Sequence, residues 1–284
     1  MLLTLMSQNL QFGGLRGGEG EPENRWQQLK QRFTSVKDVD LLLLQETWGW
    51  KNYGQKHLAQ ACNELGLEAL PLPPSSNGNG PALLYRQETL GRWQRWNDDY
   101  SGKTFTGFGV AAFEIGLPSL LSVSSVHTTP FSSDIALQEM GLITTRAYRY
   151  GPFAIIGGDC NYAPAHGPDP DYSTMRPYNV AARTLLSDSA NSERTPDRRQ
   201  AWKLEQAGFV DVAWHMYQKT KDEKYLARTA SDDRIDQFWV SQPLATAIVD
   251  YWLVDTPADA SDHKGIAFQL DTELIDTSTP WQYQ

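Results

Sequence analysis

Cysteine and long apolar runs are both scarce in this sequence. Cys62 and Cys160 are the only cysteines among the 284 residues, too few for a disulfide framework, and we expect both to be reduced. No segment reaches the roughly 18 uninterrupted apolar residues that a membrane span needs. The N-terminal run over residues 1–6 is too short for a signal peptide and lacks its basic flank. We therefore predict a cytoplasmic protein with no membrane span.

An excess of positive charge is also missing. The 25 lysine and arginine residues against 34 aspartate and glutamate residues give a formal net charge of −9. This argues against a protein that coats nucleic acid without sequence preference, because such proteins usually present a basic surface. A nucleic-acid enzyme remains compatible, since carboxylates that bind a metal ion add to the negative total. The 40% hydrophobic content is enough for a large core and excludes disorder.

Strand-like and helix-like segments alternate along the chain and predict a single α/β domain over residues 1–284. We find no tandem repeat, low-complexity segment or linker that would divide it. Strands are expected at 2–6, 39–44, 82–86, 108–115, 120–127, 153–156, 235–240 and 265–270, and helices at 23–36, 55–65, 133–149, 180–186 and 197–207. The stretch 162–199, rich in Pro, Asp and Ser, is too long for an ordinary connection and is expected to be a functional loop around its helix.

The segment 155–161 ends an apolar run in Gly-Gly-Asp-Cys-Asn. The paired glycines let the backbone turn as it leaves the sheet. Asp159 and Asn161 are two residues apart, so in an extended chain their side chains point the same way. A carboxylate beside a carboxamide can orient a water and contact a phosphate or a metal ion. The alternative is an ordinary Asx-rich turn, and this motif alone does not decide between them.

Other polar residues of catalytic type also stand at the edges of predicted strands. Each has an ordinary explanation, as a turn former, a solvated acid, a half-buried histidine or a helix cap. Open α/β sheets, however, place their sites at strand ends, which makes the whole set hard to dismiss. The set consists of Asn9, Glu46, His127, Asp159, Asn161, Asp236, Asp262 and His263.

The order of these motifs resembles the endonuclease/exonuclease/phosphatase (DNase I-like) superfamily. The resemblance spans Asn9 to His263, and Gly-Asp-x-Asn and Ser-Asp-His are its most specific motifs. Members include DNase I-like nucleases, abasic-site endonucleases, deadenylases, inositol-polyphosphate phosphatases and sphingomyelinases. The resemblance implies a four-layer α/β sandwich, in which two mixed β-sheets pack face to face with helices outside. The matching motifs are Asn9, Gln45-Glu46, Val126-His127, Gly158-Asp159-Cys160-Asn161, Arg234-Ile235-Asp236 and Ser261-Asp262-His263.

The chemistry of phosphodiester cleavage suits oxygen ligands. Negative charge grows on the leaving oxygen during in-line attack, and a hard divalent cation held by carboxylate and amide oxygens offsets it. Mg²⁺ is therefore the expected cofactor, with Mn²⁺ as a substitute. By resemblance, Glu46 is the best candidate ligand, with Asn9 and Asp262 beside it directly or through water. Many relatives carry Asn-x-Asn or Asn-x-Asp here, whereas this chain has Gln11, which weakens any two-metal arrangement that uses this position.

The resemblance also implies roles for the remaining residues. Asp159 would align or deprotonate the attacking water, and Asn161 would hold that water and a phosphate oxygen. His263 would contact the phosphate or act as general base, with Asp236 bonded to its other ring nitrogen. His127 would stabilise charge on the non-bridging oxygens or protonate the leaving group. Which histidine is acid and which is base is left open.

Substrate contacts are harder to predict. Trp48 follows Glu46, and Tyr162 follows Asn161, so each is placed to stack on a base or a leaving group. Arg176 is a candidate phosphate contact, although scattered arginines usually belong to a solvated surface. Three functions stay open: a nuclease on DNA or RNA, which we favour, a phosphatase or phosphodiesterase for a small or lipid-linked phosphate, and a catalytically silent binding module. No obligate protein partner is expected.

Overall fold

The computed structural model describes residues 1–189 and 193–278 of the chain. The strands are β1 (Leu2–Asn9), β2 (Val39–Gln45), β3 (Glu68–Ala69), β4 (Ala82–Tyr85), β5 (Arg95–Asn97), β6 (Gly109–Phe113), β7 (Leu121–His127), β8 (Ala154–Asp159), β9 (Phe209–Asp211), β10 (Asp236–Ser241), β11 (Ile248–Val254) and β12 (Gly265–Asp271). The helices are α1 (Trp26–Ser35), α2 (Lys56–Leu65), α3 (Gln87–Leu90), α4 (Ser133–Ala147), α5 (Pro177–Arg183), α6 (Arg199–Gln206) and α7 (Val212–Thr220).

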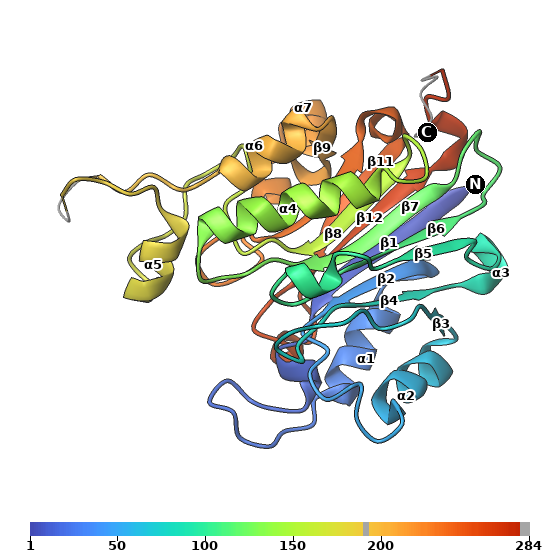
Figure 1. Cartoon of the computed structure of the whole chain (residues 1–284), viewed down its shortest axis with the longest axis horizontal. Coiled ribbons are helices and arrows are strands. Elements are labelled where there is room, and N and C mark those ends of the chain that lie inside the picture. Colours follow the sequence, from blue (N-terminus) through green and yellow to red (C-terminus); the bar gives the residue numbers. More distant parts are fainter. Residues whose placement is uncertain (190–192, 279–284) are drawn as a thin grey trace.

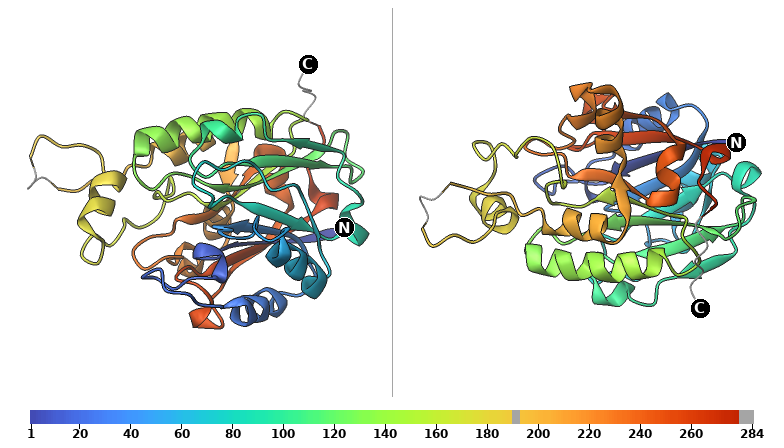
Figure 2. Two further views of the ribbon diagram at one scale, coloured as in Figure 1. Left: turned by 60° about the horizontal axis from the view of Figure 1, so that its bottom comes forward. Right: turned by 90° about the horizontal axis from the view of Figure 1, so that it is seen from above.

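The strands form two mixed six-stranded sheets. One has the strand order β11-β12-β1-β2-β4-β3 and the other β5-β6-β7-β8-β10-β9. The pairs β1·β2 and β7·β8 are parallel, and the other neighbours are antiparallel. Helices α1 and α2 cover the outer face of the first sheet, and α4 and α6 cover the outer face of the second (Figure 1). The buried residues of α7 belong to the core between the sheets. The predicted four-layer α/β sandwich is confirmed, and Figure 2 shows the same layers from two further sides.

Side chains that alternate along each strand explain this layering. Leu41 and Leu43 of β2 enter the core between the sheets, whereas Leu42 and Leu44 enter a second core under α1 and α2. On β8, Ile155 faces the core between the sheets, and its neighbour in sequence faces a third core under α4 and α6. Because both faces of these strands are buried, they read in the sequence as continuous apolar runs.

Most predicted elements are present, with boundaries shifted by a few residues. Ser132 caps α4 by accepting a hydrogen bond from the backbone N–H of Ile135, and Gly66 ends α2 with a left-handed backbone. The helix expected at 180–186 ends instead at Arg183. Strand β11 and helix α7 were not predicted; β11 contains a register shift at Asp250, which interrupts its apolar pattern.

The paired glycines lie inside β8 and do not mark a turn out of the sheet. A Cβ on Gly157 would lie 2.3 Å from the ring of Phe238, which packs across from it. A Cβ on Gly158 would lie 1.9 Å from the carbonyl oxygen of Val126 on the neighbouring strand, and its φ of +149° also disfavours a side chain. Close approach of the neighbouring chain therefore explains both glycines.

The long segment after β8 extends away from the sandwich. Figure 1 shows α5 and the chain on either side of it projecting beyond one end of the sheets before the chain returns at α6. This segment holds a helix, as predicted, and residues 190–192 within it lie outside the described residues. Among the described residues, no helix is both long and apolar enough to cross a membrane.

Candidate functional site

Strand register brings the predicted site residues together at one end of the two sheets. The parallel pair β1·β2 places Asn9 beside Gln45, immediately before Glu46. The parallel pair β7·β8 places His127 beside Asp159, and the antiparallel pair β8·β10 places Asp236 on the other side of Asp159. The site is therefore a consequence of where six strands begin or end.

Asp159 lies at the centre of this cluster. Its side chain is 2% exposed, and its Oδ2 atom accepts a hydrogen bond from Nδ2 of Asn9 at 3.0 Å. The same oxygen is 3.5 Å from Nε2 of His127 and 4.0 Å from Nε2 of His263. Two imidazoles from different strand ends thus face one carboxylate oxygen.

His263 is oriented by a second carboxylate. Its Nδ1 atom lies 2.8 Å from Oδ2 of Asp236, so Nε2 faces Asp159. Burial opposes a positive charge on this ring, but Asp236 and then Asp159 outweigh it and hold the pKa of His263 well above its ordinary value. Ligand atoms of Asp159, Asp236 and His263 lie within 4.8 Å of one another, close enough to hold a metal ion. The short contact between Asp236 and His263 is a hydrogen bond that fixes the orientation of the imidazole.

Asn161 departs from the extended geometry predicted for it. Its backbone has a φ of 57°, and its N–H donates to Oδ1 of Asp159 at 2.8 Å, which closes an Asx turn. The Asx turn is therefore part of the cluster of predicted site residues. Nδ2 of Asn161 donates to the backbone oxygen of Thr128 at 2.8 Å, so the amide is held in one orientation.

Arg183 reaches this site from α5, and the sequence carried no signal for it. Its Nη2 atom donates to Oδ1 of Asn161 at 3.3 Å, and Nη1 lies 3.5 Å from Oδ1 of Asp232. The side chain is buried. Both ends of the Asn161 amide are thus held, one by the loop after β7 and the other by the projecting segment.

Glu46 and Asp262 supply oxygen atoms on the side of Asp159 that faces Asn9. Glu46 is half-buried and accepts hydrogen bonds from Asn9 Nδ2 at 3.2 Å and from the backbone N–H of Phe12 at 2.9 Å. Asp262 remains exposed, yet protein packed around it, with Glu46 and Asp159 nearby, raises its pKa, and His263 opposes the rise. Several carboxylates that share a small volume fit a hard divalent cation.

Asn9 presents its amide nitrogen, and not its oxygen, to the neighbouring carboxylates. Its amide nitrogen is turned toward Glu46 and Asp159, and its Oδ1 accepts from the backbone N–H of Gln11 at 2.9 Å. Asn9 therefore links the two carboxylates as a donor. Contact with a cation at this position would run through water or would need the amide to turn over.

The three predicted substrate residues fare differently. Tyr162 is 1% exposed, so its ring has no open face and the stacking predicted for it is not supported. Trp48 is half-buried, and the Arg16 guanidinium lies over its ring at 3.9 Å, which leaves at most the other face open. Arg176 is exposed on the projecting segment, where it donates to the Tyr178 hydroxyl at 2.8 Å.

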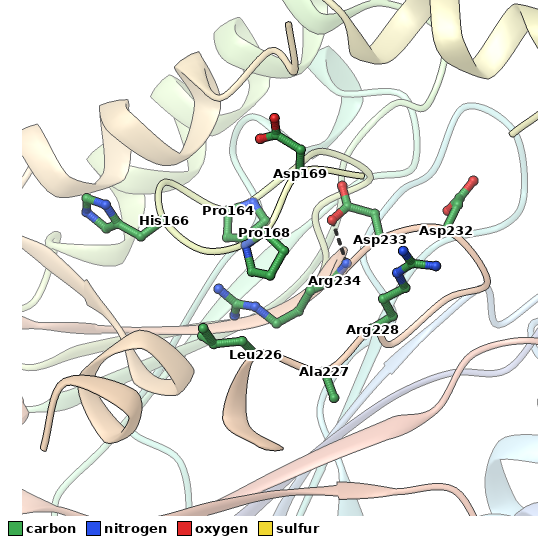
Figure 3. A pocket seen from close by; sticks show the side chains of 10 residues that line it. All are labelled: Pro164, His166, Pro168, Asp169, Leu226, Ala227, Arg228, Asp232, Asp233 and Arg234. Carbon is green, nitrogen blue, oxygen red and sulfur yellow. Dashed lines mark hydrogen bonds between the residues drawn. The ribbon is translucent and has the colours of Figure 1, made fainter. Parts of the chain in front are cut away.

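A cavity of about 260 Å³ adjoins the loops that carry Asn161 and Asp236. It lies between residues 164–169, which follow β8, and residues 226–234, which precede β10 (Figure 3). Asp233 lines it and is 4% exposed; Oδ1 accepts from the backbone N–H of Arg234, and Oδ2 has no hydrogen-bond partner among the described residues. Burial raises the pKa of Asp233 to about 6, although nearby arginines oppose the rise.

This buried carboxyl predicts a pH-dependent stability. An aspartate titrates near 3.9 in an unfolded chain, so ionisation costs more in the folded protein. Stability from the neutral form is fully present below about pH 4 and is lost as the pH rises through the folded value of about 6. The loss is about 3 kcal/mol. Asp233→Asn cannot ionise and should gain about that much over wild type between pH 4 and 7.5 in urea denaturation. Parallel pH curves for the two proteins would contradict this.

Comparisons with known proteins agree with the fold. The model of the Endonuclease/Exonuclease/phosphatase family matches residues 6–263. Similar solved structures include a 3'-5' exonuclease (NExo) from Neisseria meningitidis, with TM-score 0.66, 17% identity and coverage of 95% of this chain and 100% of that one. An AP endonuclease (LMAP) from Leishmania major has TM-score 0.60, 16% identity and coverage of 95% and 87%. TDP2 from D. rerio, complexed with single-strand DNA product, has TM-score 0.57, 16% identity and coverage of 95% and 99%. No curated protein matches the chain in sequence.

Proposed function

This chain belongs to the endonuclease/exonuclease/phosphatase family, and we propose that it is a Mg²⁺-dependent nuclease that hydrolyses a phosphodiester of DNA or RNA by in-line attack of water. The observation that carries the proposal is the convergence of two imidazole Nε2 atoms and the Asn9 amide on Oδ2 of Asp159. A carboxylate so surrounded can orient and deprotonate a water, while the imidazoles face the phosphate that the water attacks.

Each residue then has a part that follows from its contacts. Asp159 aligns the attacking water and takes its proton. Asn161 holds the water and a phosphate oxygen with an amide whose orientation Thr128 fixes. Asp236 keeps Nε2 of His263 directed toward the reacting phosphate. His127 stabilises charge on the non-bridging oxygens or protonates the leaving group.

Glu46 and Asp262 would hold the Mg²⁺, with Asn9 beside them through water. Hard carboxylate oxygens at a partly open position suit Mg²⁺, which keeps several waters of its own, and Mn²⁺ would substitute. When bound, the ion would offset the negative charge that grows on the phosphate oxygens. Gln11 adds no second acidic ligand, so a single-metal arrangement is the simpler one.

The similar structures do not choose the substrate. They include an exonuclease, an AP endonuclease and a protein bound to single-strand DNA product, and one fold supports many activities. The net charge of −9 keeps open the alternative of a phosphatase or phosphodiesterase for a small or lipid-linked phosphate. A silent binding module would not require Glu46, Asp159, Asn161, Asp236, Asp262 and His263 together.

A substrate panel with purified protein tests the proposal. Supercoiled plasmid, single-stranded DNA, RNA, an abasic duplex, an aryl phosphate monoester and diester, and inositol phosphates would be incubated with Mg²⁺ or with EDTA. We expect EDTA-sensitive cleavage of at least one nucleic acid. Hydrolysis of monoesters alone would move the function to a phosphatase, and hydrolysis of nothing would refute an enzymatic role.

Removing the charge of Glu46 should weaken Mg²⁺ binding and so raise the Mg²⁺ concentration that the enzyme needs. Glu46→Gln keeps the length and the acceptor oxygen but loses the charge, so half-maximal activity should need about tenfold more Mg²⁺ or higher. Activity at saturating Mg²⁺ should recover in part. The measurement is a Mg²⁺ titration of cleavage rate. An unchanged half-saturation would place the cation elsewhere, with the cluster of Asp159, Asp236 and His263 as the next candidate.

A further inference from the structure

Phe131 is an exposed aromatic ring close to the proposed catalytic residues. It lies four residues after His127, on the short loop between β7 and α4, and is 67% exposed. A phenyl ring that open gains nothing from the core. Nothing in the proposed reaction uses it.

A second ring supports Phe131 from the side. Phe105 lies with its ring centroid 5.2 Å from that of Phe131, at an interplanar angle of 88°. Edge-to-face contact of this kind is favourable and restrains the ring orientation. The supporting ring is half-buried. Phe131 therefore presents a ring face to solvent, and Phe105 holds that ring in place.

A buried carboxylate joins the two loops that carry these rings. Glu139 of α4 accepts a hydrogen bond from the backbone N–H of Phe105 at 2.6 Å and another from the backbone N–H of Thr129 at 2.8 Å. The hydroxyl of Thr106 also donates to the backbone oxygen of His127. Both rings are thus anchored, through their own loops, to the strand end that bears His127.

We propose that Phe131, supported by Phe105, is a stacking platform for an unpaired nucleobase beside the phosphodiester that is cut. This inference rests on the proposed nuclease function and narrows its substrate class. A base inside a duplex has both faces covered by its neighbours, so only a single strand, an end or a gap can offer a free face to the ring. Stacking on an aromatic side chain accepts every base, because each has a π-face.

In this proposal Phe131 has the base-stacking role that the sequence suggested for Trp48 and Tyr162. Trp48 has Arg16 over one face, and Tyr162 is enclosed by protein. Phe131 is open and lies on the loop that follows His127.

Binding without cleavage tests the platform independently of the reaction. A fluorescently labelled single-stranded DNA oligonucleotide would be titrated in EDTA with wild type, Phe131→Ala, Phe131→Leu and Phe131→Trp. Loss of one stacked base should weaken binding roughly 5- to 150-fold in the Ala variant. The Leu variant keeps apolar bulk without a ring and should also weaken, whereas the Trp variant should bind at least as well as wild type. Trp202→Ala removes an exposed aromatic on α6 and should change nothing.

A matched substrate completes the test in Mg²⁺. Hydrolysis of one oligonucleotide would be compared with that of the same strand carrying an abasic residue beside each candidate cleavage position. Wild type should favour the strand with the base, and Phe131→Ala should lose that preference. Equal binding by wild type and Phe131→Ala, or an unchanged preference, would overturn the platform. Base-dependent binding without any hydrolysis would support the platform and refute the nuclease reaction.

Discussion

Asp159→Asn is expected to lower kcat at least about 100-fold with little change in KM. The asparagine keeps the acceptor oxygen that receives the N–H of Asn161. It cannot accept a proton, and its amide nitrogen would meet the Asn9 nitrogen, which now donates to Oδ2. Because Asp159 lies below the surface of the site and acts on the water, substrate affinity should be spared. Steady-state kinetics on the best substrate of the panel measure both constants.

Asp40→Asn is the matched control for that experiment. Asp40 is also buried on a strand and accepts a hydrogen bond from the backbone N–H of Thr4, but it lies at the opposite end of β2 from Glu46. The same substitution there should leave kcat near wild type, even if stability falls. Asp159→Asn with a third or more of wild-type kcat would contradict the role of Asp159 as base.

The fold was predictable where burial imposes a regular pattern. Strand β2 is covered on both faces, and its sequence is therefore an unbroken apolar run. Ser132, a residue typical of helix N-caps, marks the start of α4. Strand β11 escaped prediction because it lies at a sheet edge with exposed positions, and its register shifts at Asp250. Edge strands carry a weaker pattern because only part of each face needs to be apolar.

The candidate site was predictable from strand ends, since register alone places Asp159 between His127 and Asp236. What the sequence could not supply were contacts made by segments distant in sequence. Arg183 stands in the helix predicted at 180–186, and nothing local indicates that it reaches Asn161. The exposure of Phe131 likewise depends on how neighbouring loops pack.

Local backbone geometry also limited what could be predicted from the sequence. The period of two expected for Asp159 and Asn161 fails because Asn161 adopts a left-handed backbone. The side chain of Asp159 stabilises that turn through its hydrogen bond to the backbone N–H of Asn161. The turn also directs the following residue, Tyr162, into the interior. Tyr162 is consequently buried rather than available to a substrate.

The roles of His127 and His263 can be distinguished with substrates that differ in their leaving group. A general acid matters most when the departing oxygen is strongly basic, and an aryl oxygen leaves without a proton. If His127 protonates the leaving group, His127→Ala should cost at least about 100-fold on a nucleic acid and far less on an aryl phosphodiester. His263 is held toward the phosphate by Asp236, so His263→Ala should cost at least about 100-fold on both substrates.

Asp236→Asn then tests how His263 acts. The amide can still contact Nδ1, but it withdraws the negative charge that supports an imidazolium at 2.8 Å. We expect a loss of about tenfold or more in kcat, smaller than that of His263→Ala, on nucleic acid and aryl diester alike. Removing both side chains should cost little more than His263→Ala alone, because Asp236 acts only through the ring. Additive losses would show that Asp236 contributes independently of His263, and a loss confined to the nucleic acid would make His263 the acid and leave charge stabilisation to His127.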